Sequence, residues 1–399
     1  MDIVLFLHFY QPPTQFPDVL ENVIRESYDP VLTLLENNPQ VKVTINMSAS
    51  LTEQLSLKHW EILAKFRRLC ERRQIELVGS AAYHPLLVKI PEAEISRQIK
   101  INEEINTRLW QVSSQRFKGT DSISVSRIRG FFPPEMAISA QVLKSVKSAG
   151  YSYILADESA IGSEKARLLG MGRIFIDKAT GLKVIVRHKE VSLDVAFSKI
   201  QTTADLLSKA SRLYGNNYLI LAMDGETFGH HQPEQLNFLS SLFSSAVASD
   251  GSSGLSLISI SELLARSSSS QPVSIQESSW GESFDRWDSL TNPIHKYQWE
   301  MLNLAIETVS LYSERDESYW QARNLLDKGL HSDQFWWASY KPCWHYKMVQ
   351  RGALLLLTSV SILRDESSEI KSKKALAEDL YHKLTSTSLE MYGDTVIAC

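Results

Sequence analysis

The sequence has few of the features that mark specialised classes of protein. Its 399 residues include three widely spaced cysteines, Cys70, Cys343 and Cys399. They show neither a disulfide framework nor a CxxC metal site, which favours a reducing compartment. The net charge of −4 provides no electrostatic basis for binding nucleic acid or an anionic membrane, so neither partner is expected.

Long apolar runs are also lacking. Residues 3–7 form a run too short for the core of a signal peptide, and no basic segment precedes it. Residues 352–363 fall short of a bilayer span and are more typical of a buried helix. We therefore expect a cytoplasmic protein. Nothing in the sequence indicates its oligomeric state.

Up to about residue 266, short β-type runs alternate with longer helical patterns, and no GxGxxG or P-loop motif follows any run. Alternation of this kind predicts an α/β fold with parallel strands. Seven or eight units in this length favour a (β/α) barrel over an open doubly wound sheet. Strands are expected at residues 3–7, 41–45, 75–78, 128–132, 153–155, 184–186, 218–222 and 255–258. Helices are expected between them at residues 19–35, 60–72, 92–110, 140–149, 203–213 and 234–246.

The composition changes after residue 266. A serine-rich stretch at residues 267–272 marks the start of a connecting segment, expected over residues 267–292. Beyond it the pattern is almost wholly helical, and residues 293–399 predict a helical bundle. The sequence thus divides into a barrel at residues 1–266, this connection and a C-terminal helical domain.

Polar side chains follow nearly every expected strand. If the strands are parallel, their carboxyl ends meet at one rim, where barrels of this kind carry active sites. These residues are His8, Asn46, Tyr83, His84, Glu135, Asp157, Glu158, Arg187, His188, Asp224 and Glu226.

Two of these acids are candidates for catalysis. Asp224 ends a buried run in the segment LILAMDGETFGHHQPE, and Glu135 follows two prolines that stiffen its turn. Each has a simpler explanation: Asp224 as a turn former or helix cap, and Glu135 as a first-turn residue that complements a helix dipole. Two carboxylates from separate strands at one rim are what glycoside hydrolysis needs.

The histidines allow a different interpretation. Side chains of His8, His84, His188, His230 and His231 with Asp224 could bind a divalent metal. Adjacent histidines seldom point the same way, however, and no HExxH spacing occurs. Histidines that form hydrogen bonds are therefore favoured, and neither a metal nor another cofactor is expected. Among the aromatic residues, Trp280, Tyr10 or Trp344 could stack on sugar rings, whereas Trp336 and Trp337 resemble core residues at a domain interface.

Several motifs, in this order, resemble those of glycoside hydrolase family 57. The segments are His8-Phe9-Tyr10-Gln11-Pro12, Arg73-Gln74-Ile75-Glu76, Tyr83-His84-Pro85, Phe132-Pro133-Pro134-Glu135 and Asp224-Gly225-Glu226-Thr227-Phe228-Gly229. The last matches the family's Asp-x-Glu-x-Phe-Gly motif in full. Departures are Tyr10, where a second His is usual, Arg73 in place of Gly, and Phe132 in place of Trp. Residues 332–337 also look like part of the family's helical domain.

The resemblance implies an incomplete (β/α)7 barrel with a C-terminal helical bundle and a retaining mechanism without metal. Glu135 would be the nucleophile and Asp224 the acid/base, with their carboxyl groups about 5–5.5 Å apart. The substrate would be an α-1,4-glucan or maltooligosaccharide, as for α-amylases and 4-α-glucanotransferases. Alternatives are a metal-dependent polysaccharide deacetylase and a non-catalytic glucan-binding protein. The residues expected to contact substrate are His8, Gln11, Glu76, His84, Asp157, His188, Glu226, His230, Trp280 and Trp336.

Overall fold

The computed structural model describes residues 1–116, 128–162, 168–248, 254–267, 269–281, 283–364 and 367–397. The chain forms two compact units. The first comprises residues 1–11, 16–82 and 87–280, and the second comprises residues 12–15, 83–86 and 281–399. Ser268 of the serine-rich stretch and Cys399 lie outside the described residues.

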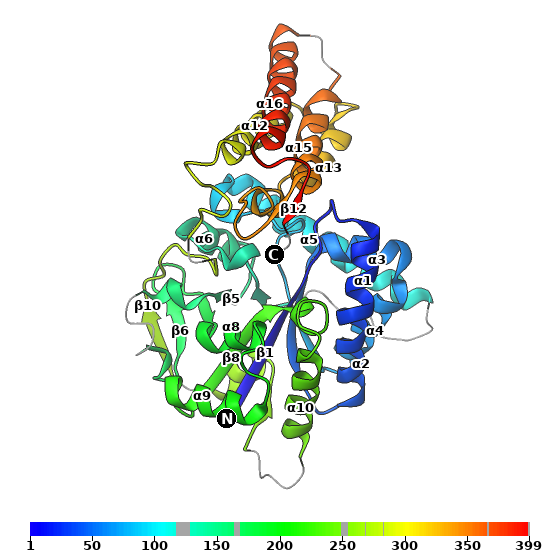
Figure 1. Ribbon diagram of the computed structural model, residues 1–399. Coiled ribbons are helices and arrows are strands. Elements are labelled where there is room, and N and C mark those ends of the chain that lie inside the picture. Colours follow the sequence, from blue (N-terminus) through cyan, green and yellow to red (C-terminus); the bar gives the residue numbers. More distant parts are fainter. Residues whose placement is uncertain are drawn as a thin grey trace. The chain divides into compact units, whose positions relative to one another are not determined.

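The first unit is built on parallel strands with helices outside them (Figure 1). Its strands are β1 (Asp2–Phe9), β2 (Val43–Met47), β3 (Ile75–Val78), β4 (Gly130–Phe131), β5 (Tyr153–Ala156), β6 (Ile174–Asp177), β7 (Lys183–Val186), β8 (Tyr218–Asp224), β9 (Ser256–Leu257) and β10 (Ser270–Val273). They form two sheets, ordered β3-β2-β1-β8 with β9 also paired to β1, and β10-β6-β7-β5-β4.

Hydrogen bonds join the two sheets at two places. Gly79, directly after β3, bonds with Gly130 and Phe132 at β4, and His188, two residues after β7, donates its N–H to the carbonyl of Ile220 in β8. The parallel strands β1, β2, β3, β4, β5, β7 and β8 therefore surround a common interior, and the fold is an incomplete (β/α)7 barrel, as expected. The helix α11 (Ile260–Arg266) places Ile260 and Leu263 in that interior core.

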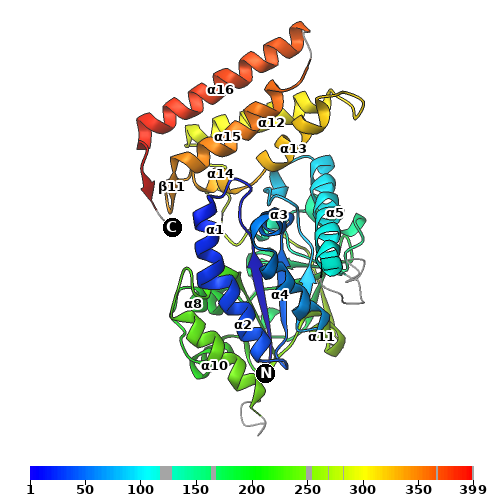
Figure 2. The ribbon, with the colours of Figure 1, turned by 90° about the vertical axis from the view of Figure 1, so that its right-hand side faces the viewer.

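The helices of the first unit lie in the intervals where the sequence predicts them, with additions (Figure 2). They are α1 (Pro17–Val23), the π-helix η1 (Ile24–Tyr28), α2 (Asp29–Asn37), α3 (Ala49–Lys58), α4 (Trp60–Glu71), α5 (Glu92–Arg116), α6 (Ala140–Ser148), α8 (Lys189–Ala196), α9 (Thr203–Tyr214), α10 (Gln235–Val247) and α11. Short 3₁₀ turns are η2 (Leu87–Lys89), η4 (Pro134–Met136), η5 (Glu158–Ile161) and η6 (Gly225–Thr227).

The sequence does not predict strand β6, which departs from the parallel order of the predicted strands. Strand β6 runs antiparallel to β7, and the Asp177 carboxylate stabilises the turn between them by accepting from the N–H and hydroxyl of Thr180. Strand β10 pairs with β6 within the stretch that composition assigned to a connecting segment. A local hairpin needs no crossover helix, so strand–helix alternation does not reveal it.

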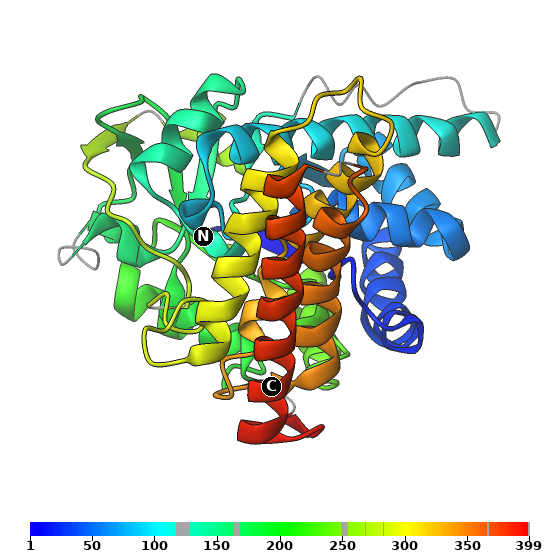
Figure 3. The same cartoon turned by 90° about the horizontal axis from the view of Figure 1, so that it is seen from above.

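The second unit is mainly helical. It contains α12 (Pro293–Ser310), α13 (Tyr319–Gly329), α14 (Asp333–Trp336), α15 (Tyr346–Ser361) and α16 (Ser368–Tyr392), with the short strands β11 (Trp344–His345) and β12 (Val396–Ile397). In Figure 3 the yellow α12, red α16 and orange α15 lie side by side, as a bundle requires. None of the described helices is both long and apolar enough to cross a membrane.

One cysteine prediction is wrong. Cys343, at the start of the β11 region, is disulfide-bonded, whereas Cys70 is a free thiol. The wide spacing of the cysteines hid this pairing, because spacing along a chain says little about distance in the fold. Cysteine usage therefore no longer supports a reducing compartment.

Candidate active site

The carboxyl ends of β1, β2 and β8 lie in register. His8 is opposite Asn46 of β2 on one side and Asp224 of β8 on the other. Two and four residues before His8, the side chains of Phe6 and Val4 belong to the interior core. Because successive side chains of a strand alternate between its faces, His8 continues the inward face at the rim. Asp224 does the same above the core residues Ala222 and Ile220.

The neighbouring strands add two more charged residues to this rim. Leu155 of β5 and Ile185 of β7 point into the core, and the next residues of the same faces are Asp157 and Arg187. Both side chains are buried. Of the polar residues predicted at the strand ends, Asp157 and Arg187 therefore face the barrel interior at the carboxyl ends of their strands.

His8 is surrounded by polar and aromatic groups of this rim. Its Nδ1 lies 2.8 Å from Oδ1 of Asn46. Its ring centroid is 4.5 Å from that of Phe132 and 6.2 Å from that of Trp280, and it stacks on Tyr10. His8 thus connects the strand that carries Asp224 with the segment that carries Glu135.

Glu135 occupies a constrained turn. It lies in η4 after Pro133 and has φ 59° and ψ 18°, in the left-handed region that residues other than glycine seldom adopt. The indole Nε1–H of Trp280 donates to Oε2 of Glu135 at 2.8 Å, and the main-chain N–H of Trp280 donates to the Glu135 carbonyl at 3.2 Å. Strained backbone of this kind persists only where the surroundings hold it, and it is common at active sites.

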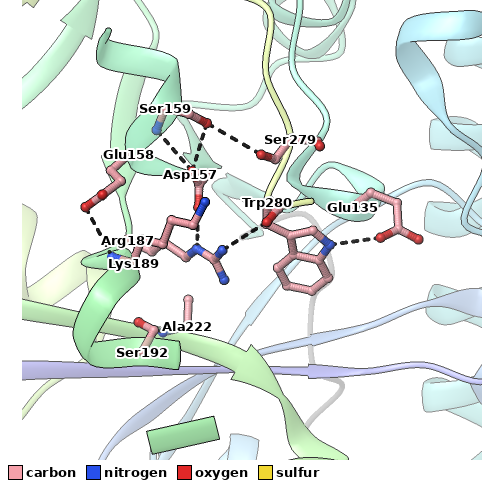
Figure 4. Close-up of polar contacts among 10 residues, drawn as sticks. All are labelled: Glu135, Asp157, Glu158, Ser159, Arg187, Lys189, Ser192, Ala222, Ser279 and Trp280. Carbon is pink, nitrogen blue, oxygen red and sulfur yellow. Dashed lines mark hydrogen bonds and ion pairs between the residues drawn. The ribbon is translucent and has the colours of Figure 1, made fainter. Parts of the chain in front are cut away.

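Behind Trp280 lies a buried ion pair, drawn in Figure 4. Arg187 Nε donates to Oδ2 of Asp157 at 2.6 Å, and Arg187 Nη2 lies 3.5 Å from the carbonyl oxygen of Trp280. Next to this pair, the Glu158 carboxylate accepts from the N–H of Lys189 at the start of α8. Asp157, predicted to contact substrate, is thus engaged with Arg187.

Glu226 lies among hydrogen-bond donors from the segments that follow β1, the neighbour of β8. Its Oε1 accepts from the Tyr28 hydroxyl at 2.8 Å and from the Gln11 side-chain amide, and its Oε2 lies 3.5 Å from Nε2 of His231. Burial, together with the charge of Glu226, raises the pKa of Tyr28 well above its ordinary value, so the hydroxyl keeps its proton. Gln11 and Glu226, both predicted site residues, are therefore brought together.

The two glycines and the phenylalanine of the Asp-Gly-Glu-Thr-Phe-Gly segment are closely packed. A Cβ at Gly225 would lie 2.8 Å from the ring of Phe9, and Phe228 is fully buried. At Gly229, φ is +107° and a Cβ would lie 1.9 Å from the carbonyl oxygen of Glu26. The motif is therefore a tight junction between β8 and the π-helix η1.

Two other predicted residues of the first unit, Glu76 and His230, form hydrogen bonds with groups other than Glu135 and Asp224. Glu76 lies one inward-facing layer below the rim, in register with Thr44, where it accepts from the hydroxyls of Tyr153 and Ser261. A cavity of about 410 Å³ next to Glu76 is lined along the length of β3, from Ile75 to Val78, and by Met47 at the end of β2. His230 pairs with Glu26 at 2.7 Å.

His188 is fully buried between the rings of Tyr214 and Tyr218. Its Nδ1 accepts from the N–H of Ile220, and burial lowers the pKa of its imidazole to about 3. It is therefore a neutral residue of the barrel wall in the structure.

Two predicted residues belong to the second unit. His84 has φ 56°, its Nδ1 lies 3.0 Å from the Ser332 hydroxyl, and burial lowers the pKa of its ring to about 4. Trp336 packs at a tilt on Trp287, with the Arg286 guanidinium 5.0 Å from its ring centroid.

Three residues next to the site, Asn46, Arg187 and Tyr28, are not among those predicted from the sequence to be catalytic or to contact substrate. Asn46 and Arg187 each follow an expected strand, so their positions were a usable signal. Tyr28 had none, because it lies within a helical pattern and meets Glu226 only in the fold. Within the described residues, no group of three or more His, Cys, Asp or Glu side chains is arranged to hold a metal ion.

The family model described as Glycosyl hydrolase family 57 matches residues 10–276. Among curated proteins, alpha-amylase 1 of Dictyoglomus thermophilum is 25% identical over 231 residues, which cover 56% of this chain and 31% of that protein. The 4-alpha-glucanotransferase of Thermococcus litoralis is 24% identical over 232 residues, 57% of this chain and 33% of that protein. The chain thus spans about a third of the length of these relatives.

Solved structures share the fold over more of the chain. The GH57-type branching enzyme of Pyrococcus horikoshii has a TM-score of 0.71 at 18% identity, covering 99% of this chain and 98% of that one. The 4-alpha-glucanotransferase of Thermococcus litoralis has a TM-score of 0.70 at 18% identity, covering 92% and 60%. At these identities the likeness concerns the fold.

Proposed function

Because the chain belongs to glycosyl hydrolase family 57, we propose that it is a retaining glycoside hydrolase or transglycosylase that acts on α-1,4-glucans. The observation that carries the proposal is the grouping of Glu135 and Asp224 around His8. Asp224 is next to His8 across β1 and β8, and Glu135 bonds to Trp280, whose ring neighbours that of His8. Two carboxylates at one barrel rim fit double displacement.

In the first step, a carboxylate oxygen of Glu135 attacks the anomeric carbon and forms a glycosyl ester. The glycosidic bond breaks, and Asp224 donates its proton to the departing oxygen. In the second step, Asp224 takes a proton from water or from an acceptor hydroxyl, whose oxygen attacks the anomeric carbon and releases Glu135. Water as acceptor completes hydrolysis, and a sugar hydroxyl completes transfer.

His8 and Trp280 are the side chains best placed to contact the sugar between the two acids, because both neighbour the Glu135 segment at the rim. Trp280 is partly exposed and offers an aromatic face to the apolar side of a sugar ring. Glu226, with Gln11, lies directly beyond Asp224 and would bind hydroxyls or orient the acid.

The relatives' names divide between hydrolysis and transfer, since they include an alpha-amylase, a 4-alpha-glucanotransferase and a branching enzyme. All of these reactions use the same glycosyl intermediate and differ in the acceptor. Maltooligosaccharide and amylose are therefore the substrates to try first. A cytoplasmic location stays a prediction, and the disulfide at Cys343 removes one of its supports.

The test is incubation of the purified protein with maltoheptaose and with amylose. Chromatography separates shorter products, which indicate hydrolysis, from longer ones, which indicate transfer, and debranching reveals new branch points. Proton NMR of the first products reports the anomeric configuration, expected to be α. Parallel samples carry Glu135→Gln or Asp224→Asn, and each should lose at least about 10³-fold in kcat.

Azide separates the two acids further. With an activated α-glucosyl substrate, Asp224→Ala should form the α-azide, because azide replaces the water that needs a base. Glu135→Ala should form the β-azide by direct attack. No product from the wild-type protein on any α-glucan, or full activity in both acid variants, would sink the proposal. Chelator-sensitive release of acetate from an acetylated polysaccharide, without cleavage of α-glucans, would instead point to a metal-dependent deacetylase.

A further inference from the structure

The ion pair between Asp157 and Arg187 is almost completely buried. The two side chains are 0% and 5% exposed, and the second carboxylate oxygen of Asp157 accepts from the N–H and hydroxyl of Ser159 at 3.0 and 2.8 Å (Figure 4). Because removing two charges from water offsets most of their attraction, a buried pair is a weak source of stability. Its position calls for another explanation.

Arg187 contacts Trp280 in two ways. The guanidinium carbon lies 5.5 Å from the centroid of the indole ring, within the range of a cation–π interaction. Its Nη2 also lies 3.5 Å from the main-chain carbonyl oxygen of Trp280. A planar guanidinium held by Asp157 therefore restrains both the ring and the backbone of Trp280.

Trp280 restrains Glu135 in turn. Its indole N–H bonds to the carboxylate and its main-chain N–H bonds to the carbonyl, so the side chain and the backbone of Glu135 are both held. Glu135 needs this support because its φ of 59° is unfavourable for a residue with a Cβ. The flanking backbone pairing between Ile138 and Ser278 brings the two segments together.

We propose that Asp157 and Arg187 are positioning residues that hold the carboxylate of Glu135 in place through Trp280. The proposal rests on the proposed function, because it takes Glu135 as the nucleophile. It replaces the sequence-based expectation that Asp157 contacts substrate. Small displacements of a reacting group cost large factors in rate, so the effect belongs in kcat and not in KM.

The first experiment compares Arg187→Lys with the wild-type protein on maltoheptaose. Lysine keeps a charge for Asp157, so Arg187→Lys should fold, yet it loses the planar contact with Trp280. We expect kcat to fall about 10²-fold with KM nearly unchanged. The matched control is the buried pair Arg323–Asp327 on α13, whose side chains are 5% and 4% exposed. Arg323→Lys should lower the melting temperature similarly and leave kcat intact.

A double-mutant cycle tests the path through Trp280. If Arg187 acts through the indole, Arg187→Lys should have little further effect on kcat in the Trp280→Phe background. If the reductions in kcat caused by Arg187→Lys and by Trp280→Phe multiply in the double variant, the two residues act independently and the proposal is contradicted. A rise in KM with kcat unchanged in Arg187→Lys would also contradict it.

A final readout does not need turnover. With ¹⁵N-labelled tryptophan, the Nε1–H signal of Trp280 is assigned by its loss in Trp280→Phe. Its exchange with solvent should become faster in Glu135→Gln and in Arg187→Lys, but not in Arg323→Lys. Unchanged exchange in Arg187→Lys would overturn the inference even in an active enzyme. If the wild-type protein has no activity on glucans, only the proposed function is refuted. The exchange measurement would still test whether Arg187 positions Trp280 and Glu135.

Discussion

Asn46 determines which nitrogen of His8 carries a proton. The Asn46 side-chain amide donates to the carbonyl oxygens of Val78 and Gly79 at 3.2 and 3.3 Å, so its Oδ1 faces His8 and can only accept. His8 Nδ1 is therefore the donor of the 2.8 Å bond. In the neutral ring the lone pair then lies on Nε2.

Replacing Asn46 should disturb both this tautomer and the fold. Asn46→Leu removes the acceptor of the His8 Nδ1–H and the side-chain donor to the Val78 and Gly79 carbonyls, of which Gly79 still accepts from the Phe132 N–H. We expect the free energy of unfolding to fall by about 1–3 kcal/mol. Urea denaturation measures that loss, and ¹⁵N NMR of the histidines reports the His8 tautomer. Asn106→Leu, which removes an amide donor to the next residue, Met47, is the control and should leave the tautomer unchanged. A wild-type His8 protonated on Nε2 alone would refute the assignment.

The hydrogen bond from the Tyr28 hydroxyl to Glu226 is expected to stabilise the fold and to leave sugar binding by the carboxylate largely unchanged. Tyr28→Phe removes a buried hydroxyl that donates to this carboxylate, and hydrogen bonds to charged groups contribute about 1.5–3 kcal/mol. We expect a loss of that size in the free energy of unfolding, with KM for maltooligosaccharide nearly constant. Chemical denaturation and steady-state kinetics measure the two effects. A large rise in KM without loss of stability would show that the network serves the substrate.

Gly229 should tolerate no side chain. Alanine there combines a positive φ with a Cβ 1.9 Å from the Glu26 carbonyl oxygen, so backbone must move. We expect Gly229→Ala to lower the free energy of unfolding by more than about 4 kcal/mol. The control is Gly150→Ala, at φ +92° with nothing within 4 Å of the added Cβ, which should cost only about 1–2 kcal/mol of backbone strain. Equal losses in the two variants would show that the close approach has no energetic consequence.

His188 should make the fold sensitive to acid. Burial lowers its pKa from 6.5 to about 3, so the folded state disfavours the protonated ring that the unfolded state accepts. The stability that His188 contributes is complete above pH 6.5 and is lost as pH falls towards 3. Uptake of one proton on unfolding makes the free energy of unfolding change by up to about 1.4 kcal/mol per pH unit. His188→Gln, whose amide oxygen can still accept from Ile220, should flatten the slope between pH 6.5 and 4 in denaturation experiments. Identical slopes would contradict the prediction.

The parallel strands of the barrel were predictable because each is a short buried run with turn residues after it. β3 begins and ends where the sequence predicts, and β1 and β8 differ only at their ends. β6 was missed because its hairpin with β7 interrupts the alternation. The disulfide at Cys343 was missed because pairing depends on the path of the chain.

By itself, the sequence determined the kinds of side chain available at the carboxyl ends of the strands, because strand alternation and parallel order bring strand ends to one rim. The tertiary structure alone decided how those side chains are used. Trp280 reaches Glu135 across 145 positions of sequence, and Asp157 pairs with Arg187 across 30. His188 is enclosed by Tyr214 and Tyr218, and Glu76 faces a lower layer of the barrel. The reason is that burial and hydrogen-bond partners depend on packing between distant segments, which local pattern does not encode.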